Sequence, residues 1–179
     1  MVWTTVYQSP IGGLILAGDG EHLTGLWIEG QKYFMAGLTE PAARKDDSPV
    51  FEQARQWLDR YFAGERPVPE ELPLRPHGTA FQRAVWECLC KIPWGQVTTY
   101  GAISWEIARQ LGRASLSAQA VGGAVGHNPI SIIIPCHRVV GADGSLTGYA
   151  GGVDRKLWLL QREGVDASRL RRPRRGSAL

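Results

Sequence analysis

Residues 131–140, Ser-Ile-Ile-Ile-Pro-Cys-His-Arg-Val-Val, are the most informative stretch of the 179-residue sequence. An apolar, strand-like run reaches Pro135, where regular pairing is expected to stop, and Cys136, His137 and Arg138 follow at once. Cysteine is a useful nucleophile only as the thiolate, and a nearby His or Arg lowers the pKa of its thiol. Three consecutive polar side chains have no packing rationale in a core. The pattern therefore predicts that Cys136 is reactive rather than a small buried hydrophobe.

Two short helices are expected before this stretch, at residues 100–111 and 116–126, joined by a brief turn that contains Gly112. Such a pair is compatible with a helix-turn-helix. The second helix is crowded with small residues, and glycine inside a helix costs roughly 1 kcal/mol relative to alanine. Its thin face predicts close contact with a nucleic-acid groove or with another helix, and both readings stay open. An earlier helix is expected from about Ala80 to Cys90, capped by Thr79.

The N-terminal part predicts a small antiparallel sheet packed with one helix. Strands are expected at residues 2–8, 14–17 and 23–28, and a helix at residues 50–63. The proline-rich residues 64–78 predict a linker. We therefore expect an α/β domain with its linker at residues 1–76, followed by a mainly α domain with a helix-turn-helix at residues 77–168. A basic, disordered tail is expected at residues 169–179.

Composition excludes several classes of protein. Hydrophobic residues make up 44% of the chain, so global disorder is excluded. No apolar run approaches the roughly 20 residues needed to cross a bilayer. The three cysteines, Cys88, Cys90 and Cys136, are poor material for a disulfide framework. Cys88 and Cys90 diverge on a helix and no Cys-x-x-Cys pair accompanies them, so no metal site is expected. A cytoplasmic protein without membrane contact fits best.

Charge changes sign along the chain. Residues 1–76 hold seven Lys and Arg against eleven Asp and Glu, whereas residues 169–179 add five arginines and no acid. A surface that binds phosphates is therefore expected in the C-terminal half. Charge alone is also compatible with a soluble protein that has a basic, frayed end.

Two motifs together resemble the signature of a known family. Residues 135–139, Pro-Cys-His-Arg-Val, and residues 148–152, Gly-Tyr-Ala-Gly-Gly, are similar to the O6-alkylguanine-DNA alkyltransferases, the methylated-DNA–protein-cysteine methyltransferases. The similarity extends from about Gly78 to Gly164. It implies direct-reversal repair: the alkyl group of O6-alkylguanine, with O4-alkylthymine as a further candidate, moves permanently to Cys136 after base flipping. The implied partner is double-stranded DNA containing O6-alkylguanine, bound by a monomer without a cofactor.

The resemblance also implies roles for individual residues. Cys136 attacks the alkyl carbon, His137 acts as its base through a water, and Glu163 orients the histidine. Tyr100 gives a hydrogen bond or proton to guanine. Near the pocket, Lys156 and Tyr149 offer a cation and a hydroxyl that can stabilise O6 and the loop. The remaining residues implied in substrate or DNA binding are Ala118, Gln119, Gly122, Asn128 and Arg138.

The sequence departs from the family pattern at one position on the predicted recognition helix. Where the family commonly has an arginine that fills the space of the flipped base, this chain has Gln119, which lacks the charge and the stacking plane of arginine. Two alternatives remain: a non-enzymatic lesion binder that recruits other factors, and a cysteine hydrolase. Cys136 with His137 and Glu163 disfavours the first. The second needs a direct pair between Cys136 and His137, which is awkward in an extended chain.

Overall fold

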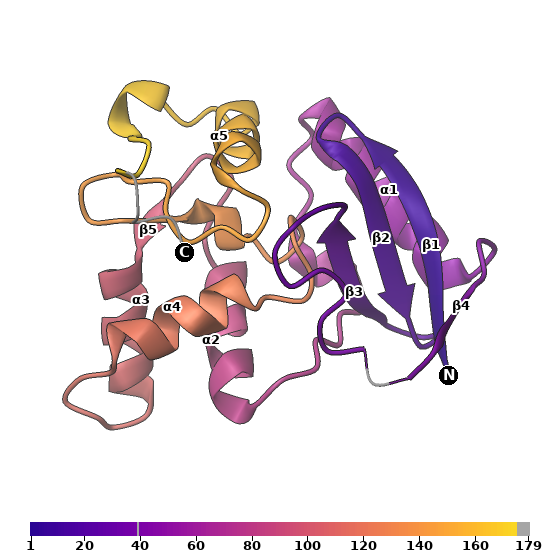
Figure 1. Ribbon diagram of the computed structural model, residues 1–179, viewed down its shortest axis with the longest axis horizontal. Coiled ribbons are helices and arrows are strands. Elements are labelled where there is room, and N and C mark those ends of the chain that lie inside the picture. The colour runs from indigo at the N-terminus through magenta and orange to yellow at the C-terminus, as the bar shows by residue number, and fades with distance from the viewer. Residues whose placement is uncertain (39, 175–179) are drawn as a thin grey trace. The chain divides into compact units, whose positions relative to one another are not determined.

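The computed structural model describes residues 1–38 and 40–174, and it divides into two compact units. Unit 1 contains Met1–Gly78 and Pro129–Ile133, and unit 2 contains Thr79–Asn128 and the chain from Ile134 onward. The predicted fold class is confirmed, since unit 1 is a small sheet with one long helix and unit 2 is mainly helical (Figure 1). No helix within the described ranges is long and apolar enough to cross a membrane.

Unit 1 is built on a four-stranded sheet with the order β3-β2-β1-β4. Its members are β1 (Val2–Ser9), β2 (Gly12–Gly18), β3 (Leu23–Ile28) and β4 (Ala42–Arg44). The first three pair antiparallel, and β4 pairs parallel with β1. Helix α1 (Pro49–Ala63) lies against the sheet and buries Phe51, Trp57 and Leu58 (Figure 1). The sequence did not indicate β4 because its three residues are exposed and carry no apolar alternation.

The proline-rich segment at residues 64–78, predicted as a linker, belongs to unit 1 and is irregular apart from a 3-10 turn at Pro69–Glu71 and one bridge between Leu23 and Leu74. The Leu23 amide donates to the Pro73 carbonyl at 2.8 Å, and the Arg75 amide donates to the Leu23 carbonyl at 2.8 Å. The C-terminal half of this proline-rich segment therefore runs along the free edge of β3, where prolines can be tolerated.

Unit 2 contains a bundle of three helices and a small two-stranded sheet. Helices α2 (Ala80–Cys90), α3 (Tyr100–Gln110) and α4 (Ala118–Gly126) pack on one another. The buried Trp86 on α2 donates its indole N–H to the Ala124 carbonyl on α4 at 2.8 Å. The other elements are β5 (Thr98–Thr99) parallel to β6 (Val139–Val140), the 3-10 turns η2 (Cys136–Arg138) and η3 (Ala167–Arg169), and α5 (Val153–Arg162).

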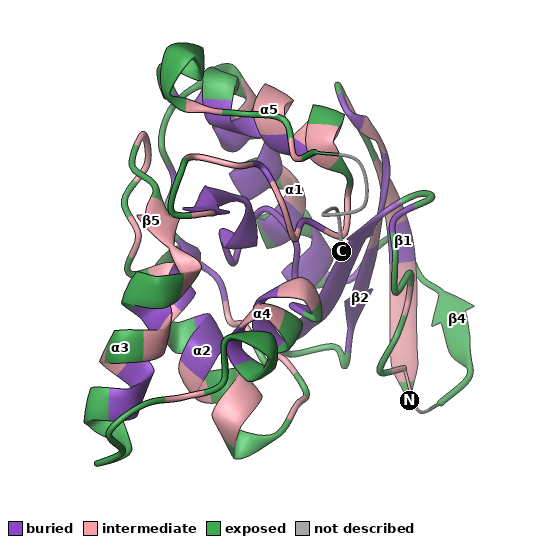
Figure 2. Cartoon of the chain, turned by 60° about the vertical axis from the view of Figure 1, so that its left-hand side comes forward, coloured by how far each residue is buried: buried purple, intermediate pink, exposed green. Residues whose placement is uncertain are grey.

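Helix α4 begins two residues later than the sequence predicts. The Ser117 hydroxyl accepts a hydrogen bond from the Ala120 amide at 3.3 Å, so Ser117 is the N-cap and Leu116 belongs to the preceding turn. The outer turns of α3 and α4 are exposed (Figure 2). This arrangement of two short helices and an intervening turn is that of the expected helix-turn-helix.

The prediction that a strand leads to Cys136 is wrong. Within residues 131–134, Ile132 adopts a left-handed φ of 71°, and the chain forms a tight turn. Only the preceding Ile130 forms a bridge, with Leu26 on β3, and the Ser131 amide donates to the Leu26 carbonyl at 2.9 Å. The run is apolar because its isoleucines are buried, and they are buried without joining a sheet. Residues 129–133 were expected within the second domain. They belong to unit 1, because Ile130 and Ser131 bond to Leu26 on β3.

The first residues of the predicted disordered tail are ordered in the structure. Residues 167–169 form η3, Leu170 packs on a buried cluster of Val140, Leu146 and Leu160, and Arg171 forms a bridge with Ser145. Burial of Leu170 and pairing of Arg171 order the start of this segment although its composition is basic. Residues 175–179 of the predicted tail lie outside the described residues.

Candidate active site

Cys136 opens the 3-10 turn η2 and is only 6% exposed. The buried Asn128, at the end of α4, donates its side-chain amide to the Ile134 carbonyl at 2.8 Å, which fixes the approach to η2. Burial raises the pKa of the Cys136 thiol, and the Asn128 amide and the Lys156 charge offset this only in part. The resting side chain is therefore a protonated thiol that needs a base before it can react.

His137, Glu163 and Arg138 form a buried charged network beside the thiol. Glu163 Oε2 lies 2.6 Å from His137 Nε2, and Glu163 Oε1 accepts from Arg138 Nε at 2.7 Å. Arg138 also donates to the Ile92 carbonyl at 2.6 Å. Burial alone would raise the pKa of Glu163, but His137 and Arg138 outweigh burial and lower this pKa to about 2. Glu163 is therefore ionised and can only accept hydrogen bonds.

The ionised Glu163 decides the tautomer of His137. Since Glu163 can only accept, His137 Nε2 carries the proton, and burial lowers the pKa of His137 so that the ring stays neutral. Nδ1 is then a proton acceptor, and it is buried without a hydrogen-bond partner among the described residues. A neutral imidazole with one free acceptor, held by a carboxylate on the other nitrogen, is the arrangement of a general base.

The Thr147 carbonyl ties together Tyr100 and Lys156. Tyr100 donates its hydroxyl to this oxygen at 2.7 Å, and Lys156 donates to it at 2.9 Å and also to the Val139 carbonyl. Lys156 is buried, and burial lowers its pKa to about 8 against the attraction of Cys136. Gly148 follows with φ 84°, and a Cβ there would overlap the Tyr100 hydroxyl. Glycine is therefore required for Tyr100 to reach this position.

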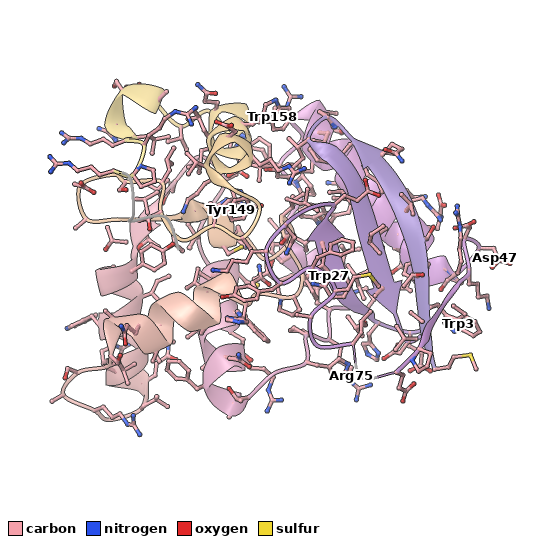
Figure 3. All side chains as sticks on the ribbon, viewed as in Figure 1. Trp3, Trp27, Asp47, Arg75, Tyr149 and Trp158 are labelled. Carbon is pink, nitrogen blue, oxygen red and sulfur yellow. The ribbon has the colours of Figure 1, made fainter. Side chains whose placement is uncertain are left out.

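Tyr149, labelled in Figure 3, lies in the segment that leads from β6 to α5. Its ring meets that of His137 edge-on, with the centroids 6.4 Å apart. The side chain is 3% exposed, and its hydroxyl has no hydrogen-bond partner in the described part of the chain. Burial raises the pKa of Tyr149 well above its ordinary value, so the hydroxyl stays protonated. Two unpaired buried polar atoms, on Tyr149 and His137, therefore lie close to the thiol.

The structure brings eight of the residues singled out from the sequence into one part of unit 2: Tyr100, Asn128, Cys136, His137, Arg138, Tyr149, Lys156 and Glu163. The other three, Ala118, Gln119 and Gly122, lie on α4, where Ala118 and Gln119 are exposed and Gly122 is half-buried. A Cβ added at Gly122 or Gly123 would meet nothing within 4 Å in the described protein. The thin face of α4 is therefore not filled by another helix of this chain.

The sequence reasoning missed the backbone part of this site. The carbonyls of Val139 and Thr147 carry no sequence signal, since any residue supplies the same oxygen. Gly148 was part of the quoted motif, and a glycine beside a tyrosine in a loop is the one signal that could have indicated a close approach. Within residues 1–38 and 40–174, no cluster of three or more His, Cys, Asp or Glu could hold a metal ion.

Comparison with known proteins gives a consistent result. The family model described as "6-O-methylguanine DNA methyltransferase, DNA binding domain" matches residues 80–165. The model of the ribonuclease-like domain of the same family matches residues 2–76. The methylated-DNA–protein-cysteine methyltransferase of Haemophilus influenzae is 44% identical over 165 residues, covering 92% of this chain and 87% of that protein. The enzyme of the same name from Mycobacterium tuberculosis is 48% identical over 166 residues, covering 91% and 93%.

A solved structure agrees with these relatives. The crystal structure of Mycobacterium tuberculosis OGT in complex with DNA superimposes with a TM-score of 0.73 at 44% identity, and the match covers 94% of each chain. The two family models leave only residues 1, 77–79 and 166–179 unmatched. This chain belongs to the 6-O-methylguanine DNA methyltransferase family.

Proposed function

We propose that the protein repairs alkylated DNA by moving the alkyl group of O6-alkylguanine in double-stranded DNA onto Cys136, once per molecule. The observation that carries this proposal is a buried thiol next in sequence to a neutral His137, whose Nδ1 has no partner among the described residues and whose Nε2 lies 2.6 Å from the ionised Glu163. The relatives named above are methylated-DNA–protein-cysteine methyltransferases. O4-alkylthymine is a further candidate substrate.

The proton of the thiol leaves toward His137. A water between Sγ and Nδ1 relays it, and the imidazolium that forms is stabilised by the ionised Glu163. The thiolate then attacks the alkyl carbon in line, so the S–C bond forms as the bond between carbon and guanine O6 breaks. The product is a stable thioether. Because this bond is not hydrolysed afterwards, each molecule acts once.

The proton that His137 takes from Cys136 passes on to the guanine, so the product is neutral, and the departing base leaves with a hydrogen bond from Tyr100. In the free protein its hydroxyl donates to the Thr147 carbonyl, so it must exchange this acceptor for the base. Lys156 donates to the same carbonyl, so Thr147 keeps a partner when Tyr100 turns. Lys156 therefore holds the loop in place during the exchange, and the Tyr149 ring packs edge-on against His137.

The exposed face of α4 suits a minor groove. Gly122 and Gly123 leave open space, so the helix backbone can approach sugar and phosphate closely, and the degenerate pattern of the minor groove suits repair that must ignore sequence. We assign Gln119, exposed on the first turn of α4, to the space vacated by the flipped base, where its amide can hydrogen-bond the orphaned cytosine. Ala118 lies beside it.

The proposal includes the setting of the reaction. Residues 77–168 carry both DNA binding and catalysis, and residues 1–76 form a separate N-terminal domain. The whole catalytic arrangement lies within one chain, so a monomer is sufficient. Among the described residues, Cys88, Cys90 and Cys136 form no disulfide, which suits the reducing cytoplasm.

The test mixes the purified protein with a duplex that carries one O6-methylguanine and records the intact mass and the modified peptide. A gain of one CH2 on Cys136, saturating at one per protein, is the expected result. Cys136→Ser should gain no mass and should still bind the duplex, whereas Cys88→Ser should react normally as a matched control. Lesion binding without a mass change in the wild type would instead show a non-enzymatic recruiter, and multiple turnover on a small ester would show a hydrolase.

A further inference from the structure

The recognition helix carries no charge of its own. Residues 118–126 contain no Lys, Arg, Asp or Glu. In the preceding turn and α3, Arg109 is paired with Glu106 at 2.7 Å, which leaves Arg113 as the further basic residue between residues 100 and 128. Phosphate contacts supply most of the nonspecific affinity for DNA. The cations that hold DNA must therefore come largely from elsewhere in the protein.

The C-terminal segment holds such cations. Residues 153–174 contain seven basic and three acidic residues, and the buried Lys156 and Glu163 belong to the active site. Five of the basic residues are exposed, and four of these, Arg169, Arg171, Arg172 and Arg174, lie in residues 169–174, the arginine strap. Arg172 pairs with Asp154 at 2.7 Å, but both side chains are largely exposed, so phosphate can replace this contact at little cost.

The arginine strap is fixed to the protein through its backbone. The Arg171 amide donates to the Gly144 carbonyl at 2.9 Å, and the Leu146 amide donates to the Arg171 carbonyl at 2.8 Å. Leu170 is anchored on the apolar cluster of Val140, Leu146 and Leu160. Gly144 has φ 84°, and a Cβ there would overlap the Arg169 carbonyl oxygen. The strap therefore needs glycine at residue 144 to lie where it does.

This attachment places the arginine strap next to the active-site loop. Leu146, which bonds to Arg171, immediately precedes Thr147, whose carbonyl holds Tyr100 and Lys156. Leu146 thus connects the strap directly to the loop residue that holds Tyr100 and Lys156. Exposed guanidinium groups therefore lie on a segment that is bonded to the loop contacted by Tyr100.

We propose that the arginine strap binds phosphates of the DNA strand that carries the flipped nucleotide, and that it supplies the charge that α4 lacks. This inference rests on the proposed function for its substrate. The partner is recognised as a double-stranded phosphodiester, through guanidinium groups that can each contact a phosphate with two N–H donors. Its sequence plays no part, because phosphate contacts fix position and do not read bases.

The main test measures the salt dependence of duplex binding for a triple variant, Arg171→Gln, Arg172→Gln and Arg174→Gln. Each lost phosphate contact should reduce the slope of log affinity against log salt by about 0.9, so a reduction of about 2 to 3 is expected, with about tenfold or greater loss of affinity at physiological salt. The matched control removes the same charge from unit 1, with Arg44→Gln, Arg60→Gln and Arg66→Gln, and should leave the slope unchanged. Equal slopes in the triple variant and the control would overturn the inference.

A second variant separates a positioned surface from loose charge. Gly144→Ala keeps every arginine but forces the arginine strap away from its seat, so it should reduce the salt slope in the same direction, with thermal unfolding recorded to confirm that the protein is folded. An unchanged slope would show that the strap acts only as a mobile counter-charge. Neutral methylphosphonates placed one at a time around the lesion should cost the wild type more affinity than the triple variant. If each methylphosphonate costs the wild type and the triple variant the same affinity, other residues contact those phosphates.

Methyl transfer keeps this inference separate from the proposed function. At saturating duplex the triple variant should transfer its methyl group as fast as the wild type, because Cys136 and its network are untouched. A wild type that binds the duplex but gains no mass would overturn the proposed function. The salt dependence of binding would then still decide whether the strap contacts phosphates. Normal transfer with equal slopes would overturn the strap alone.

Discussion

Glu163→Gln removes the charge at the centre of the buried network while preserving the shape of the side chain. Glu163 accepts from Arg138 Nε at 2.7 Å and from His137 Nε2 at 2.6 Å. Glutamine presents an N–H2 group to one of these two donors, and it leaves Arg138, which is almost fully buried, without a counter-charge. The variant should therefore be much less stable than the wild type at neutral pH.

Two routes give the same order of magnitude for this loss. The pKa of Glu163 falls from 4.5 to about 2, and each unit corresponds to roughly 1.4 kcal/mol, so ionisation in the network contributes roughly 3 kcal/mol. Removing one partner of a buried ion pair typically costs about 3 to 5 kcal/mol. Since the pKa of Glu163 is lowered by folding, this stability is present above about pH 4.5 and is lost as the pH falls toward 2.

The assay is urea unfolding of the wild type and Glu163→Gln at a series of pH values from neutral down to the acid limit of folding. The difference in free energy of unfolding should be near 3 kcal/mol at neutral pH and should shrink below about pH 4.5. Glu106→Gln is the control, because the pair of Glu106 and Arg109 has the same 2.7 Å distance but lies at the surface, so its loss should change stability little. A loss no larger than that of the control, or one that does not shrink in acid, would refute the buried network as the cause.

Three further predictions concern the site and the recognition helix. Gly148→Ala should displace the Tyr100 hydroxyl and slow methyl transfer by about tenfold or more, measured in single turnover, with duplex binding retained. Gly123→Ala should raise the free energy of unfolding by about 0.5 to 1 kcal/mol, because its Cβ meets nothing in the described protein, and should weaken duplex binding if this face enters a groove; unchanged binding would place the groove elsewhere. Wild-type transfer should be nearly independent of pH above 6.5, because the pKa of His137 is lowered and the ring is neutral there, and should fall only as His137 protonates in acid. In His137→Gln the raised pKa of Cys136 should instead make the rate climb with pH through the alkaline range, and parallel profiles would exclude His137 as the base.

Much of the fold follows from local signals in the sequence. Thr79 and Thr99 cap α2 and α3 as expected of hydroxyl residues before apolar periodicity, and α1 keeps its predicted helical face. The run at residues 131–134 misled because apolar residues bury equally well in a turn, and only the left-handed Ile132 distinguishes the two. Residues 169–171 misled because composition describes charge, whereas the half-buried Leu170, packed on an apolar cluster, and the bridge of Arg171 hold the segment in place.

The site was predictable to a different extent. Motif residues such as Cys136 and His137 were identified together because their types and order already imply a nucleophile and a base. Their geometry could not be predicted, because the partner Glu163 is 26 residues from His137 in sequence. Only the packing of α5 brings Glu163 to His137. The shared acceptor at Thr147 is a backbone atom, and no pattern of side chains can indicate it.

The burial of Cys136 has a consequence for the long period before any lesion is met. A reagent that is consumed by its only reaction must survive, unspent, in a solution that contains peroxides and small electrophiles. With 6% exposure and a raised pKa, the sulfur carries little thiolate, and it is the thiolate that such compounds capture. Cys88 and Cys90 are more accessible and would be modified first. The burial of the thiol therefore determines how long the protein stays active before it meets a damaged base.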